Sequence, residues 1–253
     1  MEVILTLHEL RAHQSTFKPP LANIAGVRGL NAGDGFVFET HCHSYVSDGA
    51  ASPELLVRVA SSRGVRILSV TDHDTFRGST LAWRASRALG LDVIVVYGAE
   101  VSTTWGDVLV YCLEPMREPL PADVWELRDE AVKHNCVIAA PHPFHPFMLS
   151  VGFRLLRNGG LFDAIEVWNG KTIPVFNIPA IIYARRYGKP AFSGSDAHVP
   201  SAVGETPSIV YSKTEKPEDV LEALRRGLVK PTVKLMSLRA LVEDIAWSVY
   251  RRI

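Results

Sequence analysis

The stretch FVFETHCHSYVSDGAASPELLVRVASSRGVRILSV, residues 36–70, predicts a strand, a helix and a second strand. Residues 36–40 are rich in aromatic and β-branched side chains, which favours a strand. Ser52 directly precedes Pro53, a pattern typical of a helix N-cap and first helical position, and Gly64 is typical of a helix end. The apolar run 66–70 predicts the next strand. This order favours two parallel strands joined by a crossover helix.

The same alternation continues through the rest of the chain and predicts an α/β fold with a mainly parallel sheet. Further strands are expected at 93–97, 108–111, 137–140, 164–167, 191–193 and 209–211, and helices at 80–89, 121–134, 179–187, 217–226 and 238–252. The number of units favours a closed, barrel-like arrangement, with an open doubly wound sheet as the alternative. Residues 1–35 are predicted to form an N-terminal extension, and residues 36–253 a barrel domain that includes the C-terminal helix.

The composition argues against several classes of protein. The 253 residues include 27 basic and 27 acidic side chains, so the formal net charge is zero. This balance argues against broad binding to nucleic acid or to an anionic membrane. No long, charge-free apolar stretch predicts a transmembrane helix. Cys42, Cys112 and Cys136 lie in apolar, strand-like runs and cannot all pair internally, so we expect no disulfide framework and a cytoplasmic location.

Side chains of the types that bind metals follow the predicted strands, near the point where each strand ends. Because parallel strands bring their carboxyl ends to one face, we expect these side chains to converge. His41 and His43 are two residues apart and therefore lie on one face of an extended chain, whereas Cys42 points the other way. The residues concerned are His41, His43, Asp48, His73, Glu100, His142, His145, Glu166, Asp196 and His198.

The number of these side chains exceeds what one four-coordinate zinc ion needs, so the sequence predicts more than one metal ion. Zinc, manganese and iron all accept mixed histidine and carboxylate ligands, and the sequence does not choose among them. Asp72 and Asp74, which flank His73, are more readily explained as turn residues, because aspartate hydrogen-bonds nearby backbone groups. Clustered metal ions suit the hydrolysis of phosphate esters.

Five motifs together resemble the PHP (polymerase and histidinol phosphatase) family, in particular its short stand-alone metal-dependent phosphoesterases. They are HCHSYVSDG (41–49), TDHDT (71–75), GAEVS (98–102), PHP (141–143) and GSDAH (194–198). The resemblance implies a distorted (β/α)7 TIM-like barrel with two or three divalent metal ions at the carboxyl ends of the strands. It assigns the first ion to His41, His43, Glu100 and Asp196. Glu100 would bridge to a second ion that His142 also binds, and the third would be held by Asp48, His73 and His198.

One position departs from the family pattern. Many relatives have a histidine after the glutamate motif, just before an apolar strand, where it completes the second metal site. Here that place in TWGDVLV (104–110) is taken by Asp107. Aspartate is shorter than histidine and negatively charged, but it can still bind a metal ion. We predict that Asp107 lies within ligand reach of a metal.

These observations predict a phosphoesterase that acts on a small anionic substrate, such as a nucleotide or sugar phosphate, through metal-activated hydroxide. His145 is the candidate proton donor, and Arg154 is the candidate phosphate contact, with Lys171 as another. The alternative for both cations, that they are ordinary surface residues, stays open. The alternatives are an amide or lactone hydrolase that uses the same metals, and a non-catalytic binding module stabilised by metal.

Overall fold

The computed structural model describes residues 35–251, so the predicted N-terminal extension lies almost entirely outside the described residues. Ten strands are formed by β1 (Phe36–Glu39), β2 (Ile67–Leu68), β3 (Ile94–Val95), β4 (Tyr97–Thr103), β5 (Gly106–Cys112), β6 (Val137–Ala140), β7 (Ala164–Asn169), β8 (Ala191–Gly194), β9 (Ser208–Val210) and β10 (Val229–Pro231). The helices are α2 (Pro53–Ser62), α3 (Arg77–Leu89), α4 (Val124–Lys133), α5 (Leu155–Asn158), α6 (Pro174–Tyr187), α7 (Pro217–Arg225) and α8 (Leu238–Tyr250).

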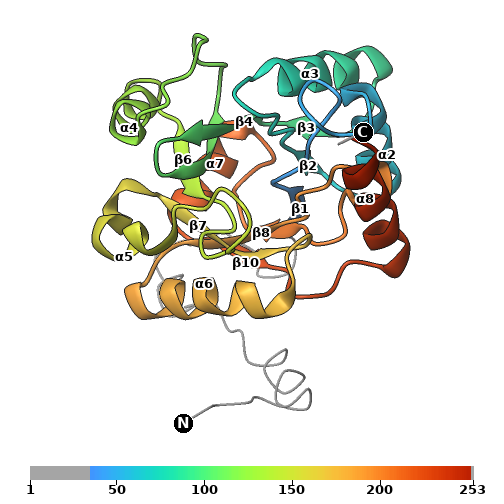
Figure 1. Cartoon of the computed structure of the whole chain (residues 1–253). Coiled ribbons are helices and arrows are strands. Elements are labelled where there is room, and N and C mark those ends of the chain that lie inside the picture. The colour runs from blue at the N-terminus through green and yellow to red at the C-terminus, as the bar shows by residue number, and fades with distance from the viewer. Residues whose placement is uncertain (1–34, 252–253) are drawn as a thin grey trace. The chain divides into compact units, whose positions relative to one another are not determined.

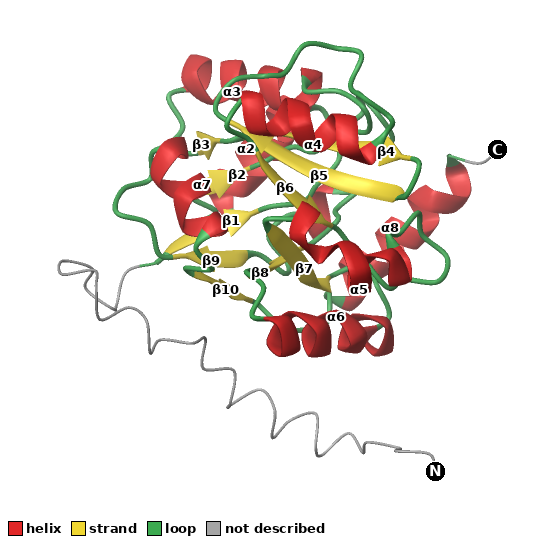
Figure 2. Cartoon of the chain, turned by 90° about the vertical axis from the view of Figure 1, so that its left-hand side faces the viewer, coloured by secondary structure: helices red, strands yellow, loops and turns green. Residues whose placement is uncertain are grey.

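The strands form two five-stranded sheets, in the orders β10-β9-β1-β2-β3 and β4-β5-β6-β7-β8. This confirms the α/β fold. The expectation of mainly parallel strands is wrong, because β1–β2, β2–β3, β6–β7 and β7–β8 are parallel whereas β1–β9, β9–β10, β4–β5 and β5–β6 are antiparallel. Figure 1 shows the strands at the centre, with α3, α2, α8, α6, α5 and α4 around them. Figure 2 shows the same elements from the side, with β9 and β10 next to each other.

The two sheets do not join through continuous hydrogen bonding into one closed barrel. They are linked instead by two isolated bridges, Cys42 with Ala197 and His73 with Glu100, and by hydrogen bonds between Ser193 of β8 and Ser208 of β9. Three of the four bridge residues lie just beyond the ends of β1, β2 and β8, and Glu100 lies within β4. The two sheets therefore touch where the sequence predicts the metal ligands.

The hairpin of β4 and β5 explains much of the antiparallel pairing. Only Thr104 and Trp105 separate the two strands, and so short a connection can join only antiparallel neighbours. Gly106 has a positive φ of 123°, and a Cβ atom there would lie 2.5 Å from the backbone carbon of Ser150. The hairpin pairs Asp107 with Ser102, two residues beyond Glu100 on the neighbouring strand.

Most predicted helices are confirmed to within a few residues. The Ser52 side chain caps α2 by accepting a hydrogen bond from the Leu55 backbone, and Gly90 ends α3 in the left-handed conformation. Helix α6 begins at Pro174 rather than at Pro179, which lies inside it. No helix of the described chain is long and apolar enough to cross a membrane.

The structure corrects the expectation for the cysteines, because Cys112 and Cys136 form a disulfide. The register of the antiparallel pair β5–β6 aligns Tyr111 with Val137, so the next residues along, Cys112 and Cys136, lie opposite each other with a Cα–Cα distance of 4.4 Å. This distance is suitable for a disulfide. Cys42 is buried and free. Sequence patterning missed the pair because the register of the two strands decides it.

Reduction of this disulfide is expected to destabilise the protein. The two cysteines are 24 residues apart, and closure of a loop of that size stabilises a fold by about 3 kcal/mol. The melting temperature should fall by about 6–12 °C on reduction for a domain of this size. Calorimetry with and without a phosphine reductant measures the effect. The C112A/C136A double variant should not respond to the reductant, and three free thiols in the untreated protein would contradict the prediction.

Candidate metal centre

The structure brings the predicted ligands together in three overlapping groups, within each of which the potential ligand atoms lie within 4.8 Å of one another. The first group contains His41, His43 and Glu100. The second contains Glu100, Asp107 and His142, and the third contains His43, Asp48, His73 and His198. Asp196 belongs beside the first group, since its Oδ1 lies 3.3 Å from His43 Nε2 and 3.7 Å from His41 Nε2. All nine side chains predicted as ligands thus share one site, and their binding of metal remains a prediction.

Glu100 links the first two groups. Its Oε2 lies 3.3 Å from His41 Nε2 and 3.2 Å from His43 Nε2, while its Oε1 lies 3.1 Å from His142 Nε2. Both oxygens of one carboxylate therefore face imidazole nitrogens on different sides. This geometry matches the bridging position that the motifs assign to Glu100.

The backbone around the ligands is unusual in two places. His142 and Asp196 have positive φ angles of 28° and 50°, a region that residues other than glycine seldom adopt. Such conformations persist where the surrounding structure fixes them, and they are concentrated at functional sites. Gly194 is also required by close packing, because a Cβ atom there would lie 2.6 Å from the Cβ of His41.

Two buried carboxylates contact the predicted ligands from behind: Glu166, which the sequence placed among the converging side chains, and Glu39, to which it assigned no role. Glu166 places Oε1 3.1 Å from His41 Nδ1, and its Oε2 accepts a hydrogen bond of 2.8 Å from the His142 backbone. Asn169 donates to both Glu166 and Asp196. Glu39 accepts hydrogen bonds from the backbone of His41, Ser195 and Gly204. Partners of this kind fix the orientation of a metal-binding histidine.

The pKa values of the clustered side chains are shifted in different directions. Burial alone would lower the pKa of His43, but hydrogen bonds and ion pairs with Asp196 and Glu100 outweigh it and raise the pKa to about 10. Burial and the neighbouring charge of Glu100 raise the pKa of Asp107 to about 6. Burial opposes the charged form of Glu100 too, but the adjacent His41 and His142 hold its pKa well below the usual range.

The donor set fits divalent cations. The nitrogens His41 Nε2 and His43 Nε2 face each other at 3.2 Å, an arrangement that a shared cation would explain. The Nδ1 atoms of His43 and His73 are buried without a hydrogen-bond partner among the described residues. Unpaired buried polar atoms are rare in folded proteins and call for a ligand. Imidazoles combined with carboxylates suit zinc, manganese or iron.

Asp74 lies in a turn, as predicted, whereas Asp72 does not: its partners are two serines far away in the sequence. Asp72 is fully buried and accepts hydrogen bonds from the Ser44 backbone, the Ser44 hydroxyl and the Ser47 hydroxyl. Asp74 has a positive φ of 57° and accepts a hydrogen bond from the Ser102 backbone. His73, between them, faces the metal ligands.

The two candidate catalytic residues, His145 and Arg154, differ in burial and in their contacts. His145 is partly buried, and its backbone donates to the carbonyl of His142; burial, followed by the charge of His142, lowers its pKa. Arg154 is exposed, and its side chain makes no ion pair with any residue in 35–251. The structure therefore does not bring Arg154 into the three groups. Lys171 does reach them, with Nζ 3.0 Å from His198 Nδ1.

Comparison with known proteins identifies relatives along most of the chain. A sequence model of the PHP domain matches residues 39–172, and a model described as PHP-associated matches residues 174–229. An uncharacterised protein of Methanocaldococcus jannaschii is 29% identical over 124 residues, which cover 48% of this chain and 68% of that protein.

Two enzymes match over shorter segments. A 5'-3' exoribonuclease of Haemophilus influenzae is 43% identical over 68 residues, which cover 27% of this chain and 24% of the enzyme. A 3',5'-nucleoside bisphosphate phosphatase of Chromobacterium violaceum is 33% identical over 95 residues, covering 36% of this chain and 33% of the enzyme. The chain thus spans a third or less of the length of either enzyme.

Solved structures of other proteins have a similar fold. A two-domain Bacteroides vulgatus protein that contains a predicted PHP-like metal-dependent phosphoesterase superposes with a TM-score of 0.67 at 20% identity, covering 86% of this chain and 72% of that one. Together the two family models span all nine predicted ligands. On the match over residues 39–172, the chain belongs to the PHP domain family.

Proposed function

We propose that this protein is a metal-dependent phosphoesterase that hydrolyses a small phosphate ester, and that the nine clustered side chains hold two or three divalent cations. The observation that carries the proposal is the sharing of Glu100 and His43 among three groups of candidate ligands. Cations so arranged bind phosphoryl oxygens, activate water and stabilise a leaving oxygen. The phosphatase and exoribonuclease relatives support phosphate esters as the substrate class.

The side chains around the groups would orient the substrate and move protons. Burial and the neighbouring His142 lower the pKa of His145, which favours the neutral imidazole and suits it to accept a proton better than to donate one. Lys171 supplies a positive charge beside His198, where a substrate phosphate could bind. We assign the phosphate contact to Lys171 in preference to Arg154, because only Lys171 contacts a predicted ligand.

We also propose that the barrel closes through the bridges at Cys42–Ala197 and His73–Glu100, as the family resemblance implies. The N-terminal extension at 1–35, the single domain at 36–253 and the cytoplasmic location remain predictions.

The proposal is tested by reconstitution. Protein stripped with a chelator should be inactive, and addition of Mn²⁺, Zn²⁺ or Fe²⁺ should restore hydrolysis of p-nitrophenyl phosphate or a nucleoside 3',5'-bisphosphate. Short RNA and bis-p-nitrophenyl phosphate distinguish diester from monoester activity. Hydrolysis of amides or lactones, with no turnover of any phosphate ester, would contradict the proposal. The absence of turnover with every metal would favour a binding module.

Metal binding is expected to release protons. In the metal-free protein His43, with a pKa of about 10, carries a proton at pH 7 that a metal ion must displace. Asp107, with a pKa of about 6, is ionised at pH 7 but protonated at pH 5, so its proton is released only in the more acidic buffer. Calorimetric titration in buffers of different ionisation enthalpy counts these protons. Asp107→Asn should remove the extra proton at pH 5 only, and proton release independent of pH would contradict the assignment.

A further inference from the structure

The C-terminal helix α8 places one of its faces against the third group of ligands, His43, Asp48, His73 and His198. Ala240, Asp244 and Trp247 of α8, and Arg251 at its C-cap, follow one another at spacings of four, three and four residues and therefore lie on the same side. Ala240 and Asp244 are buried, and Asp244 Oδ2 lies 3.9 Å from Lys171 Nζ. Figure 1 shows α8, in dark red, beside α2.

Two residues of this face bind Asp48 directly. Trp247 Nε1 donates a hydrogen bond of 2.8 Å to the backbone carbonyl of Asp48, and the Arg251 guanidinium forms an ion pair with its Oδ2. The same Oδ2 lies 3.1 Å from His198 Nε2 and 3.7 Å from His73 Nε2. The guanidinium therefore holds the oxygen that faces the other ligands of the third group.

The third group is also the least negative of the three. It has a single carboxylate, Asp48, whereas the first group combines Glu100 with the adjacent Asp196 and the second combines Glu100 with Asp107. Lys171 and Arg251 also lie at the third group, but Asp244 offsets the charge of Lys171. A divalent cation bound there would therefore be repelled mainly by Arg251.

We propose that Arg251 is a built-in competitor of the third cation: it neutralises Asp48 and makes the third group the weakest of the metal sites. Helix α8 thereby sets the metal occupancy of the centre. Both family models end before α8, at residues 172 and 229, so this control comes from a segment outside the matched parts of the family. The inference rests on the metal binding of the proposed function and not on its substrate.

Mn²⁺ titration of the metal-free protein tests the proposal. Calorimetry together with the electron paramagnetic resonance signal of free Mn²⁺ gives the number of bound ions and the dissociation constant of the weakest one. Arg251→Gln should bind that ion about tenfold more tightly, within the usual range of coupling between two sites. Arg251→Lys retains the charge and should stay close to the wild-type value.

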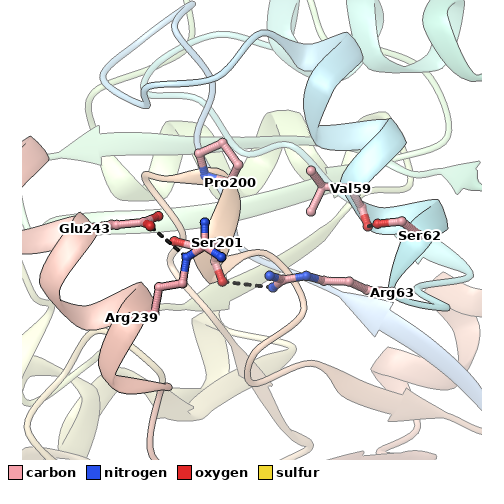
Figure 3. A pocket seen from close by; sticks show the side chains of 7 residues that line it. All are labelled: Val59, Ser62, Arg63, Pro200, Ser201, Arg239 and Glu243. Atoms are coloured by element: carbon pink, nitrogen blue, oxygen red, sulfur yellow. Dashed lines mark hydrogen bonds and ion pairs between the residues drawn. The ribbon is translucent and has the colours of Figure 1, made fainter.

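Arg239→Gln is the matched control on the same helix. Arg239 pairs with Glu243 at 2.8 Å, and both line a separate pocket between α2 and α8 that contains none of the predicted ligands (Figure 3). This variant loses the same charge as Arg251→Gln but should leave every Mn²⁺ constant unchanged. An equal gain in both variants would mean that overall charge, and not the contact with Asp48, controls affinity, and it would overturn the proposal.

The Asp48→Asn background locates the effect. Once the shared carboxylate is gone, Arg251→Gln should tighten binding much less than it does in the wild-type background, because Arg251 then acts only by direct repulsion and no longer competes for the same oxygen. Weaker or unchanged binding in Arg251→Gln alone would also overturn the proposal. A protein that shows the expected Mn²⁺ constants but hydrolyses no phosphate ester would contradict the proposed function while supporting this inference.

Discussion

Glu100→Gln is expected to lower kcat/KM for phosphate-ester hydrolysis by at least about a thousandfold, because loss of metal-based charge stabilisation removes several kcal/mol from the transition state. Glu100 contacts His41 and His43 through one oxygen and His142 through the other. Glutamine has no negative charge, and its amide nitrogen would face either the imidazoles or the cation. The variant should therefore lose at least one bound metal ion, measured by plasma mass spectrometry beside the kinetic assay.

The matched control is Glu130→Gln. Glu130 lies on α4, half-exposed, and its carboxylate pairs with Lys133 at 2.7 Å. Removal of that charge should change neither activity nor metal content, because surface ion pairs of this kind contribute little. A Glu100→Gln protein that retains wild-type turnover and its full metal content would contradict the bridging role.

The sequence predicted which side chains cluster better than it predicted the residues that support them. His41 and His43 follow from strand alternation, and the order of the motifs supplied the more distant members, including Asp107 in place of the usual histidine. Glu166 was recognised only as a residue near a strand end, because its contact with His41 depends on how β7 lies relative to the end of β1. Local patterns do not contain that relation.

In the fold, too, local features were predicted and tertiary relations were not. The Ser52 cap and Gly90 allowed the bounds of α2 and α3 to be predicted closely. The direction of strand pairing depends on tertiary structure, and it was predicted wrongly. The C-terminal helix α8 shows this limit most clearly. Its apolar side, with Leu241, Ile245 and Val249, is exposed, while the opposite side carries Asp244 and contacts the ligands. Hydrophobic periodicity defines two faces of a helix but does not show which face packs against the rest of the protein.

Asp72→Ala is expected to act on stability and to cost about 4 kcal/mol of the free energy of unfolding, since it breaks three hydrogen bonds and leaves buried donors unpaired. The Asp72 carboxylate accepts from the Ser44 backbone at 2.8 Å and from the hydroxyls of Ser44 and Ser47 at 2.6 Å. These bonds fix the segment that leads from His43 to Asp48. Urea unfolding of the metal-free protein measures the loss without the contribution of bound metal.

Asp72→Asn separates hydrogen bonding from the loss of the side chain. Asparagine retains one acceptor for the Ser44 backbone and fills the same space, so it should destabilise the protein by less than alanine does. Asp129→Ala, at an exposed position of α4, should change stability by no more than about 0.5 kcal/mol. If Asp72 were instead a metal ligand, Asp72→Asn would abolish binding of one ion while leaving the unfolding curve of the metal-free protein unchanged. The three hydrogen bonds favour the opposite result, in which the unfolding midpoint falls and the number of bound ions at saturating Mn²⁺ stays the same.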